Sequence, residues 1–223
     1  MEQGTITVEG TGSIHVVPDV TRLEVSVESV FKSYDEAYAK ARENTEWIGK
    51  ILEYNGLNAK LAKTTRFDIS DHQLNQYDDD DNYIGKVKDG FDLNQSFKID
   101  LGIDAILLNK IVRGVGKFII GAQINIGYTI RDPRPHKLKM IDRAVRDAKE
   151  KATIMASAAD CKLGSVSSIS YEENSLHIYS QARNIHSNNE AMACKPDSLD
   201  ITPDDLVMSD NVNVVWNLIP NKE

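Results

Sequence analysis

The residues with the clearest capacity for chemistry form an acidic run, Asp78 to Asp81, flanked by Tyr77 and Tyr83. Four adjacent carboxylates could bind a hard cation such as Ca²⁺ through oxygen ligands. In a calcium loop starting at Asp78, however, Tyr83 takes the sixth position, where glycine is needed, and Asp89 the twelfth, where a bidentate glutamate is expected. Adjacent carboxylates in a loop are usually solvated and repel one another, so we interpret the run as an exposed loop tip.

Histidine and cysteine offer no local site. No two histidines lie three to five residues apart, the usual spacing of zinc ligands; they are His15, His72, His136, His177 and His186. Cys161 and Cys194 could form one disulfide or remain two free thiols, and unpaired thiols are the preferred interpretation. No sequence rule places a histidine beside either thiol, so both are interpreted as structural or incidental rather than nucleophilic.

Short glycine pairs do not amount to a nucleotide site. Gly10-Thr11-Gly12 and Gly114-Val115-Gly116 each match half of a dinucleotide fingerprint but lack the third glycine at the required offset. A phosphate-binding G-x-x-x-x-G-K-[ST] loop and a G-x-S-x-G elbow are also absent from the sequence. We therefore predict no catalytic, cofactor-binding or metal-binding residues and no cofactor, and we expect a non-enzymatic protein.

Composition excludes further classes of function. The 223 residues include 26 Lys+Arg and 34 Asp+Glu, a net charge of −8, which is the wrong sign for neutralising phosphates, so no nucleic-acid partner is expected. The longest stretch without a charged residue, 118–130, is much shorter than the roughly 20 apolar residues of a membrane-spanning helix. Because the segment Met1–Thr5 has no secretory-signal character, we expect either a cytoplasmic protein or one whose signal has been removed.

Alternation of apolar and polar residues with a period of two predicts several strands. The clearest is Thr21–Val30. The others are Leu57–Ser70, Ser96–Leu101, Ile119–Ile130, Val166–Tyr171 and Asn211–Leu218. The polar segment 72–92 is predicted to be the tip of a long hairpin. Near the N-terminus, Thr5–Glu9 and Ile14–Val17 are expected to be extended and separated by Gly10-Thr11-Gly12.

Capping signals predict helices between these strands. The first begins at Ser33, which forms a capping box with Glu36, and ends at Asn55-Gly56. The second is capped by Asp104, and the third follows Asp132-Pro133-Arg134-Pro135, since proline is favoured in a first turn. The third helix is long and Ala-rich, and its predicted buried stripe comprises Leu138, Ile141, Val145, Ala148, Ala152, Met155 and Ala159. Trp47 and Trp216 are expected in the core or at an interface.

The order β-α-β-β-α-β-α-β-β predicts an α+β fold with largely antiparallel sheets and packed helices. We predict a single region spanning residues 1–223, with two candidate subdomains, 21–102 and 103–219. Residues 172–205 are rich in Asn, Ser and Asp and are predicted to form a long loop. The negative charge is thereby concentrated in the hairpin tip and this loop.

Two segments in this order resemble the SIMPL domain family, a bacterial domain of unknown function. The segment Ile6–Asp19 is similar to the family's opening V-x-G-x-G and Pro-Asp turn. The segment Asp142–Ala152, followed by Leu163-Gly164, is similar to its late Ala-rich helix. The resemblance implies a periplasmic or envelope location, a link to oxidative stress or self-assembly into large ring-like or channel-like oligomers. It carries over no catalytic residue, because none is established for the family.

Two functions are compatible with these observations. The leading hypothesis is a self-associating protein, a homo-oligomer whose further protein partner is unknown. The alternative is a module that binds a small ligand or cation through the acidic loop or through a cleft between the two halves.

Overall fold

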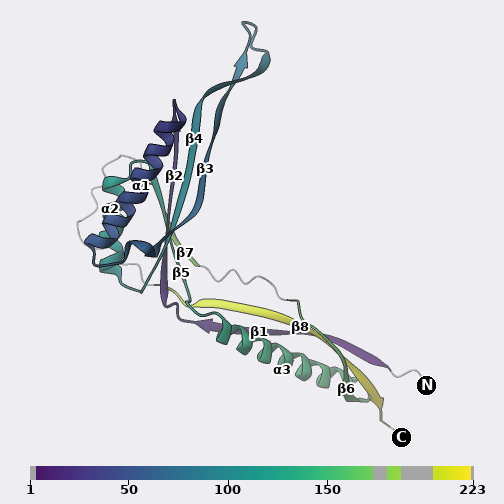
Figure 1. Ribbon diagram of the computed structural model, residues 1–223. Coiled ribbons are helices and arrows are strands. Elements are labelled where there is room, and N and C mark those ends of the chain that lie inside the picture. The colour runs from purple at the N-terminus through teal and green to yellow at the C-terminus, as the bar shows by residue number, and fades with distance from the viewer. Residues whose placement is uncertain (1–3, 173–179, 187–202, 222–223) are drawn as a thin grey trace. The chain divides into compact units, whose positions relative to one another are not determined.

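The computed structural model describes residues 4–172, 180–186 and 203–221 and confirms the predicted α+β fold (Figure 1). The helices are α1 (Tyr34–Tyr54), α2 (Ala105–Phe118) and α3 (Arg134–Ala158), with a 3-10 turn at Ala59–Leu61. The strands are β1 (Thr5–Val16), β2 (Val20–Phe31), β3 (Ala62–Tyr77), β4 (Tyr83–Leu101), β5 (Ala122–Thr129), β6 (Cys161–Ser170), β7 (Ser180–His186) and β8 (Leu206–Pro220).

The described strands form two antiparallel sheets. One has the order β1-β8-β6 and the other the order β3-β4-β2-β5-β7. Each neighbouring pair is joined by a continuous or bulged antiparallel ladder, as the alternating sequence predicts.

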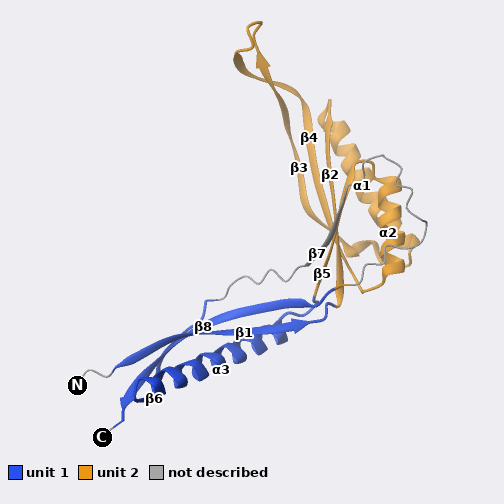
Figure 2. Cartoon of the chain, turned by 180° about the vertical axis from the view of Figure 1, so that it is seen from behind, with its two compact units in different colours: residues 1–18, 130–179, 204–223 blue, residues 19–129, 180–203 orange. Residues whose placement is uncertain are grey.

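Contacts divide the chain into two compact units, which Figure 2 distinguishes by colour. Unit 1 consists of Met1–Pro18, Ile130–Tyr179 and Asp204–Glu223, and unit 2 of Asp19–Thr129 and Ser180–Pro203. This division differs from the candidate subdomains 21–102 and 103–219. Residues 105–129 belong with unit 2 because Leu108, Ile111 and Ile126 are buried in the same core as β2 and β4.

In unit 2, helices α1 and α2 cover one face of the five-stranded sheet. Ile48 and Leu52 of α1 and Ile111 of α2 share one core with Leu23 and Phe97 of the sheet. The capping predictions are confirmed: Ser33 and Glu36 form the capping box of α1, and the Asp104 carboxylate accepts from the amide of Leu107 at the start of α2.

The acidic hairpin is more regular than predicted. Strands β3 and β4 pair through Gln73–Lys88 and continue to Tyr77–Tyr83, so only residues 78–82 form the tip. The segment 72–92 is therefore mostly a paired ribbon, because cross-strand hydrogen bonds satisfy the backbone even where the side chains are polar.

In unit 1, helix α3 packs on the three-stranded sheet along a row of small residues. The buried row is Met140, Ala144, Ala148, Ala152 and Ala156, at intervals of four. The predicted stripe was wrong in part, since Leu138 and Met155 are 61% and 51% exposed. A helix that contacts a sheet closely along one narrow row fully buries only that row. Ile141 and Val145 beside it are half-buried, whereas Leu138 and Met155 remain in solvent.

The close approach of α3 to β1 explains why residues 10 and 12 are glycines. Strand β1 runs through both glycines without interruption, so the predicted separation of Thr5–Glu9 from Ile14–Val17 was wrong. A Cβ at Gly10 would overlap the carbonyl oxygen of Ala144, and one at Gly12 would overlap that of Met140. Glycine here permits backbone contact between strand and helix rather than a turn.

The predicted loop 172–205 contains a strand. Residues Ser180–His186 form β7, which pairs with β5 although its own sequence lacks clear alternation. The pairing comes from the exposed edge of β5, a tertiary feature. The rest of that loop, residues 173–179 and 187–202, lies outside the described residues, as does Cys194.

A buried polar pair links α1 to the sheet. The Asn44 side-chain amide donates to the Gln95 side-chain oxygen at 3.3 Å, and Gln95 donates to the Ala41 carbonyl at 3.1 Å and to the Thr45 hydroxyl at 3.0 Å. Asn44 and Gln95 are 0% and 2% exposed. The pair fixes the position of α1 along β4, because any shift of the helix would leave buried polar groups without partners.

We expect Gly10→Ala and Gly12→Ala each to lower the free energy of unfolding by about 1–3 kcal/mol, since the added methyl group forces α3 away from β1. Gly116→Ala is the matched control. A Cβ at Gly116 meets no atom within 4 Å, so alanine in this helical position should raise stability by up to about 1 kcal/mol. Urea denaturation followed by circular dichroism measures all three, and an unchanged midpoint for Gly10→Ala would contradict the packing argument.

We also expect Gln95→Leu to destabilise the protein by about 1–3 kcal/mol, because it leaves the buried Asn44 amide without its acceptor. The double variant Asn44→Leu with Gln95→Leu should recover part of that loss, since both polar groups are then removed. A double-mutant cycle in urea measures the coupling between the two side chains. Strictly additive effects would show that the pair does not act as a unit.

Candidate functional site

The acidic run lies at the tip of the β3–β4 hairpin, as predicted. Its first member is committed to holding the turn: the Asp78 carboxylate accepts from the backbone amides of Asp80 and Asn82, each at 2.9 Å. The hydrogen bonds from Asn82, first that of its backbone, lower the pKa of Asp78. Asp79, Asp80 and Asp81 remain exposed, so the tip presents three carboxylates to its surroundings.

Aromatic and apolar side chains accompany these carboxylates. The rings of Tyr77 and Tyr83 meet edge to face at 6.0 Å on opposite sides of the turn, and both are exposed. Three residues before Tyr77 on β3, Leu74 is the cross-strand partner of Val87, and the two are 45% and 48% exposed. The end of the hairpin therefore exposes acidic, aromatic and apolar side chains.

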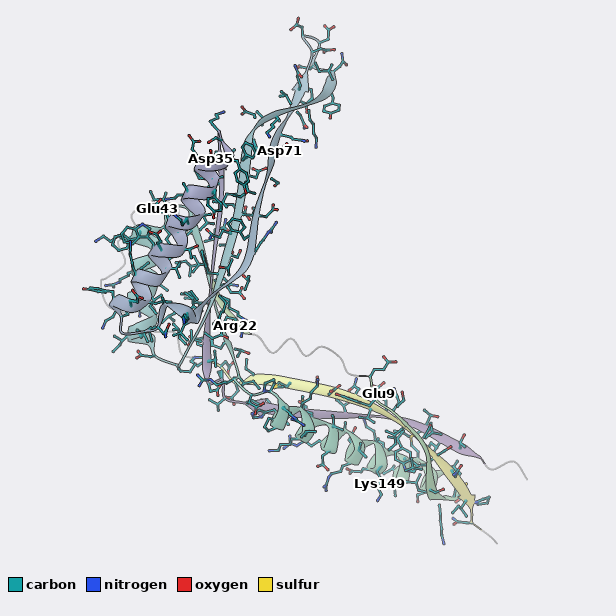
Figure 3. The ribbon with its side chains drawn as sticks, in the orientation of Figure 1. Glu9, Arg22, Asp35, Glu43, Asp71 and Lys149 are labelled. Atoms are coloured by element: carbon teal, nitrogen blue, oxygen red, sulfur yellow. The ribbon has the colours of Figure 1, made fainter. Side chains whose placement is uncertain are left out.

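Within the part of the chain that the structure describes, no other strand of the sheet pairs with the end of this ribbon. Strand β2 pairs with β4 only as far as Phe31 and Phe91, whereas β3 and β4 continue together to Tyr77 and Tyr83 (Figure 1). The ion pair between Lys88 and Asp71 at 2.7 Å lies on this ribbon (Figure 3). An isolated two-stranded ribbon is only marginally stable in water, so this segment gains most from contact with another surface.

The described part of unit 2 also contains a groove of about 920 Å³ between the C-terminal half of α1 and the length of α2. Its floor is formed where Gly114 of α2 faces Ile51 of α1: a Cβ at Gly114 would lie 2.9 Å from the Ile51 side chain. The missing side chain lets the two helices approach and leaves the space above them open.

An aromatic pair forms one wall of this groove. The rings of Trp47 and Phe118 stack with centroids 4.4 Å apart and planes at 12°. The Lys50 ammonium lies over the Trp47 ring at 5.0 Å and that of Lys117 over the Phe118 ring at 5.2 Å. Cations held over aromatic faces keep a positive charge at the rim of an apolar surface.

The remaining groove residues are mostly cationic or exposed. The charged lining residues are Lys50, Lys110, Arg113 and Asp104. Tyr54 projects from the end of α1 with 91% of its surface exposed. Three cations and one carboxylate form a positive site within a chain whose net charge is −8.

Glu43 fixes the orientation of the Trp47 ring. Its carboxylate accepts from the indole N–H at 3.3 Å and pairs with Lys40 at 2.9 Å (Figure 3). The hydrogen bond from Lys40, followed by that from Trp47, lowers the pKa of Glu43. The hydrogen bond from the indole N–H to this carboxylate favours the orientation in which the Trp47 ring stacks on Phe118.

Histidine and cysteine do not converge in the described residues. Within residues 4–172, 180–186 and 203–221, no three His, Cys, Asp or Glu side chains are arranged to hold a metal ion. His72 Nδ1 lies 2.8 Å from the Asp92 carboxylate as an isolated pair on the hairpin. Cys161 is half-buried at the start of β6.

Sequence reasoning found the acidic tip but missed the groove. Trp47 was expected in the core or at an interface and is a half-buried groove wall, whereas Trp216 is buried in the core of unit 1. The groove joins two helices separated by the whole β3–β4 hairpin, and no local spacing reveals that contact. The exposed aromatic at Phe118, beside Lys117 at the end of α2, was the available signal.

Chemically, the tip and the groove are suited to binding. Each presents charge beside aromatic surface, and neither places a nucleophile next to a base. Among the described helices, none is both long and apolar enough to cross a membrane.

Comparison with known proteins agrees with the resemblance noted from the sequence. The model of the SIMPL family, described as a protein of unknown function (DUF541), matches residues 6–216. A search of curated proteins found no match. The matched region begins in β1 and ends in β8, so it includes segments of both units. The chain belongs to the SIMPL family.

Proposed function

We propose that this protein is a non-enzymatic, self-assembling protein. The observation that carries the proposal is the β3–β4 ribbon beyond Phe91. It exposes Leu74, Val87, Tyr77 and Tyr83, and no third strand or helix among the described residues of unit 2 covers them. The envelope or oxidative-stress setting of the proposal rests on the family resemblance.

The ribbon is suited to association because it presents both backbone and side chains. Strand β3 is the outer strand of its described sheet, so one row of its N–H and C=O groups has no strand partner there. Apolar side chains on the same ribbon add area that can be buried against a second copy. Both features favour contact between proteins.

The edge of unit 1 is treated differently. Side chains of α3 reach the backbone of β1: Arg143 donates to the Ser13 carbonyl at 2.6 Å, and the Asp147 carboxylate accepts from the Thr11 amide at 2.8 Å. Lys151 donates to the Glu9 carbonyl at 3.3 Å. Helix α3 covers the β1 edge, whereas the described β3 edge is long and open. This difference supports a role for the β3 edge in association.

Among the alternatives, binding of a small ligand is favoured by the α1–α2 groove, whose volume falls within the range of about 300–1,000 Å³ typical of ligand pockets. Cation binding by Asp78–Asp81 has weaker support, because amide donors already occupy the Asp78 carboxylate. A cleft between the two halves stays a prediction from the sequence.

We expect the wild-type protein to show a concentration-dependent mass above 24.9 kDa, and the Leu74→Ser, Val87→Ser double variant to associate about tenfold more weakly. The loss follows from removing apolar area that assembly would bury. Multi-angle light scattering and sedimentation velocity, at protein concentrations of roughly 1 to 100 μM, measure the mass and the strength of association of both proteins.

The matched control is Asn75→Ser with Lys86→Ser. These residues are the adjacent cross-strand pair, and their side chains point to the opposite face of the ribbon. A wild-type protein that stays monomeric at every concentration would refute self-assembly, and equal effects of the two double variants would refute a role for the apolar face.

A further inference from the structure

We infer that the acidic tip of one copy binds in the α1–α2 groove of a second copy. The inference rests on the proposed self-assembly and names the two surfaces that meet. It follows from the charge, the aromatic content and the placement of the tip and the groove within unit 2.

Opposite charge is the first argument. The groove is lined by Lys50, Lys110 and Arg113, and both lysines are exposed. Its one carboxylate, Asp104, accepts from the Leu107 amide as the cap of α2. Each contact between exposed opposite charges is attractive but screened by water and salt, so docking depends on several such contacts made together.

The partner of such a groove must carry several negative charges close together. Asp79, Asp80 and Asp81 provide three exposed carboxylates on consecutive residues. Asp78 is already bound to the turn and holds the other three outward. The tip is therefore pre-organised, and docking would cost little further ordering of its backbone.

Aromatic matching is the second argument. Tyr77 and Tyr83 flank the carboxylates, and the Trp47–Phe118 stack flanks the groove cations. Tyrosine and tryptophan rings pack favourably by offset or edge-to-face contact and are enriched at interfaces. A tip that carries both carboxylates and tyrosines thus complements a groove that carries both cations and an aromatic wall.

The tip cannot reach the groove of its own chain. Tyr34, at the start of α1, packs against Phe91 at 6.0 Å, and α1 then runs back along the sheet, so Trp47 and Tyr54 lie roughly 20–30 Å from that point. The tip lies roughly 25 Å from Phe91 in the opposite direction along β4. In Figure 1 the turn that joins β3 to β4 and the C-terminal end of α1 lie toward opposite ends of this sheet.

A reciprocal pair of tip–groove contacts would be isologous and would close a two-fold dimer, whereas a single contact, with one tip in one groove, is heterologous. After a single contact, each copy keeps one unused tip or one unused groove, so further copies can add. Such head-to-tail contacts close into rings when the rotation permits and otherwise extend into filaments.

Charge exchange tests the inference directly. The tip variant is Asp79→Lys with Asp80→Lys; it spares Asp78, which holds the turn, and Asp81, whose φ is 62°. The groove variant is Lys50→Glu with Lys110→Glu. Each variant alone should associate at least about tenfold more weakly than wild type, because its tip and groove then carry the same charge.

Mixing the two variants should restore association. The reversed tip of the first is complementary to the reversed groove of the second, and their unaltered surfaces also match. Sedimentation velocity of each variant and of the equimolar mixture, in reducing buffer at low and high salt, measures this. Wild type and mixture should both dissociate as salt rises, since exposed charge pairs are screened.

The control is Lys139→Glu with Lys149→Glu on the exposed face of α3 (Figure 3 labels Lys149). It changes the net charge by the same amount as the groove variant does. It should assemble as wild type does. Circular dichroism checks that every variant is folded. If the groove variant is unfolded, the milder Lys50→Gln, Lys110→Gln double variant replaces it.

The possible failures are distinct. Wild type that never associates refutes the proposed self-assembly and, with it, this inference. Wild type that associates while the groove variant associates equally well leaves self-assembly standing and refutes the docking; the groove would then belong to another anionic ligand or an acidic partner protein. A mixture no stronger than its components also refutes the docking.

Discussion

The mismatch in length between β4 and β2 is the constraint on which the functional argument depends. Strand β4 spans Tyr83–Leu101, whereas β2 ends at Phe31, opposite Phe91. Up to that point a third strand and α1 pack with the hairpin and build a core. Beyond it, among the described residues, only β3 and β4 continue. The chain reverses direction at Ser33, between β2 and α1, so the helix runs back over the sheet. The groove at the far end of α1 and the free ribbon therefore lie at opposite ends of one unit.

Both units depend on small or polar details at helix–sheet contacts. In unit 1, Gly10 and Gly12 admit the backbone of α3, and side chains of that helix cover the edge of β1. In unit 2, the Asn44–Gln95 pair sets the position of α1 on β4, and Gly114 sets its distance from α2. These contacts determine which surfaces are used internally. The hairpin tip and the groove are not used in these internal contacts, and each presents charged side chains beside exposed aromatic rings.

The net charge of −8 acquires a local meaning from this arrangement. Part of the acidity lies at the end of a paired ribbon, where Asp79–Asp81 project together, and a group of cations faces the space between α1 and α2. A strongly acidic chain resists non-specific association through self-repulsion, whereas a few placed cations allow a specific contact. Separation of charge within one unit is thus compatible with the proposed tip-to-groove contact.

The fold class, the main strands and helices, the caps of α1 and α2 and the exposed acidic turn could be predicted from the sequence, because periodicity and caps depend on neighbours a few residues apart. The sequence pointed to the wrong side chains along part of α3, and it did not show that β1 is continuous or that Ser180–His186 is a strand. Those features depend on which surface a helix or an open strand edge meets. The groove was decided by tertiary structure alone, since Trp47 and Phe118 are brought together only when both helices pack on the same sheet.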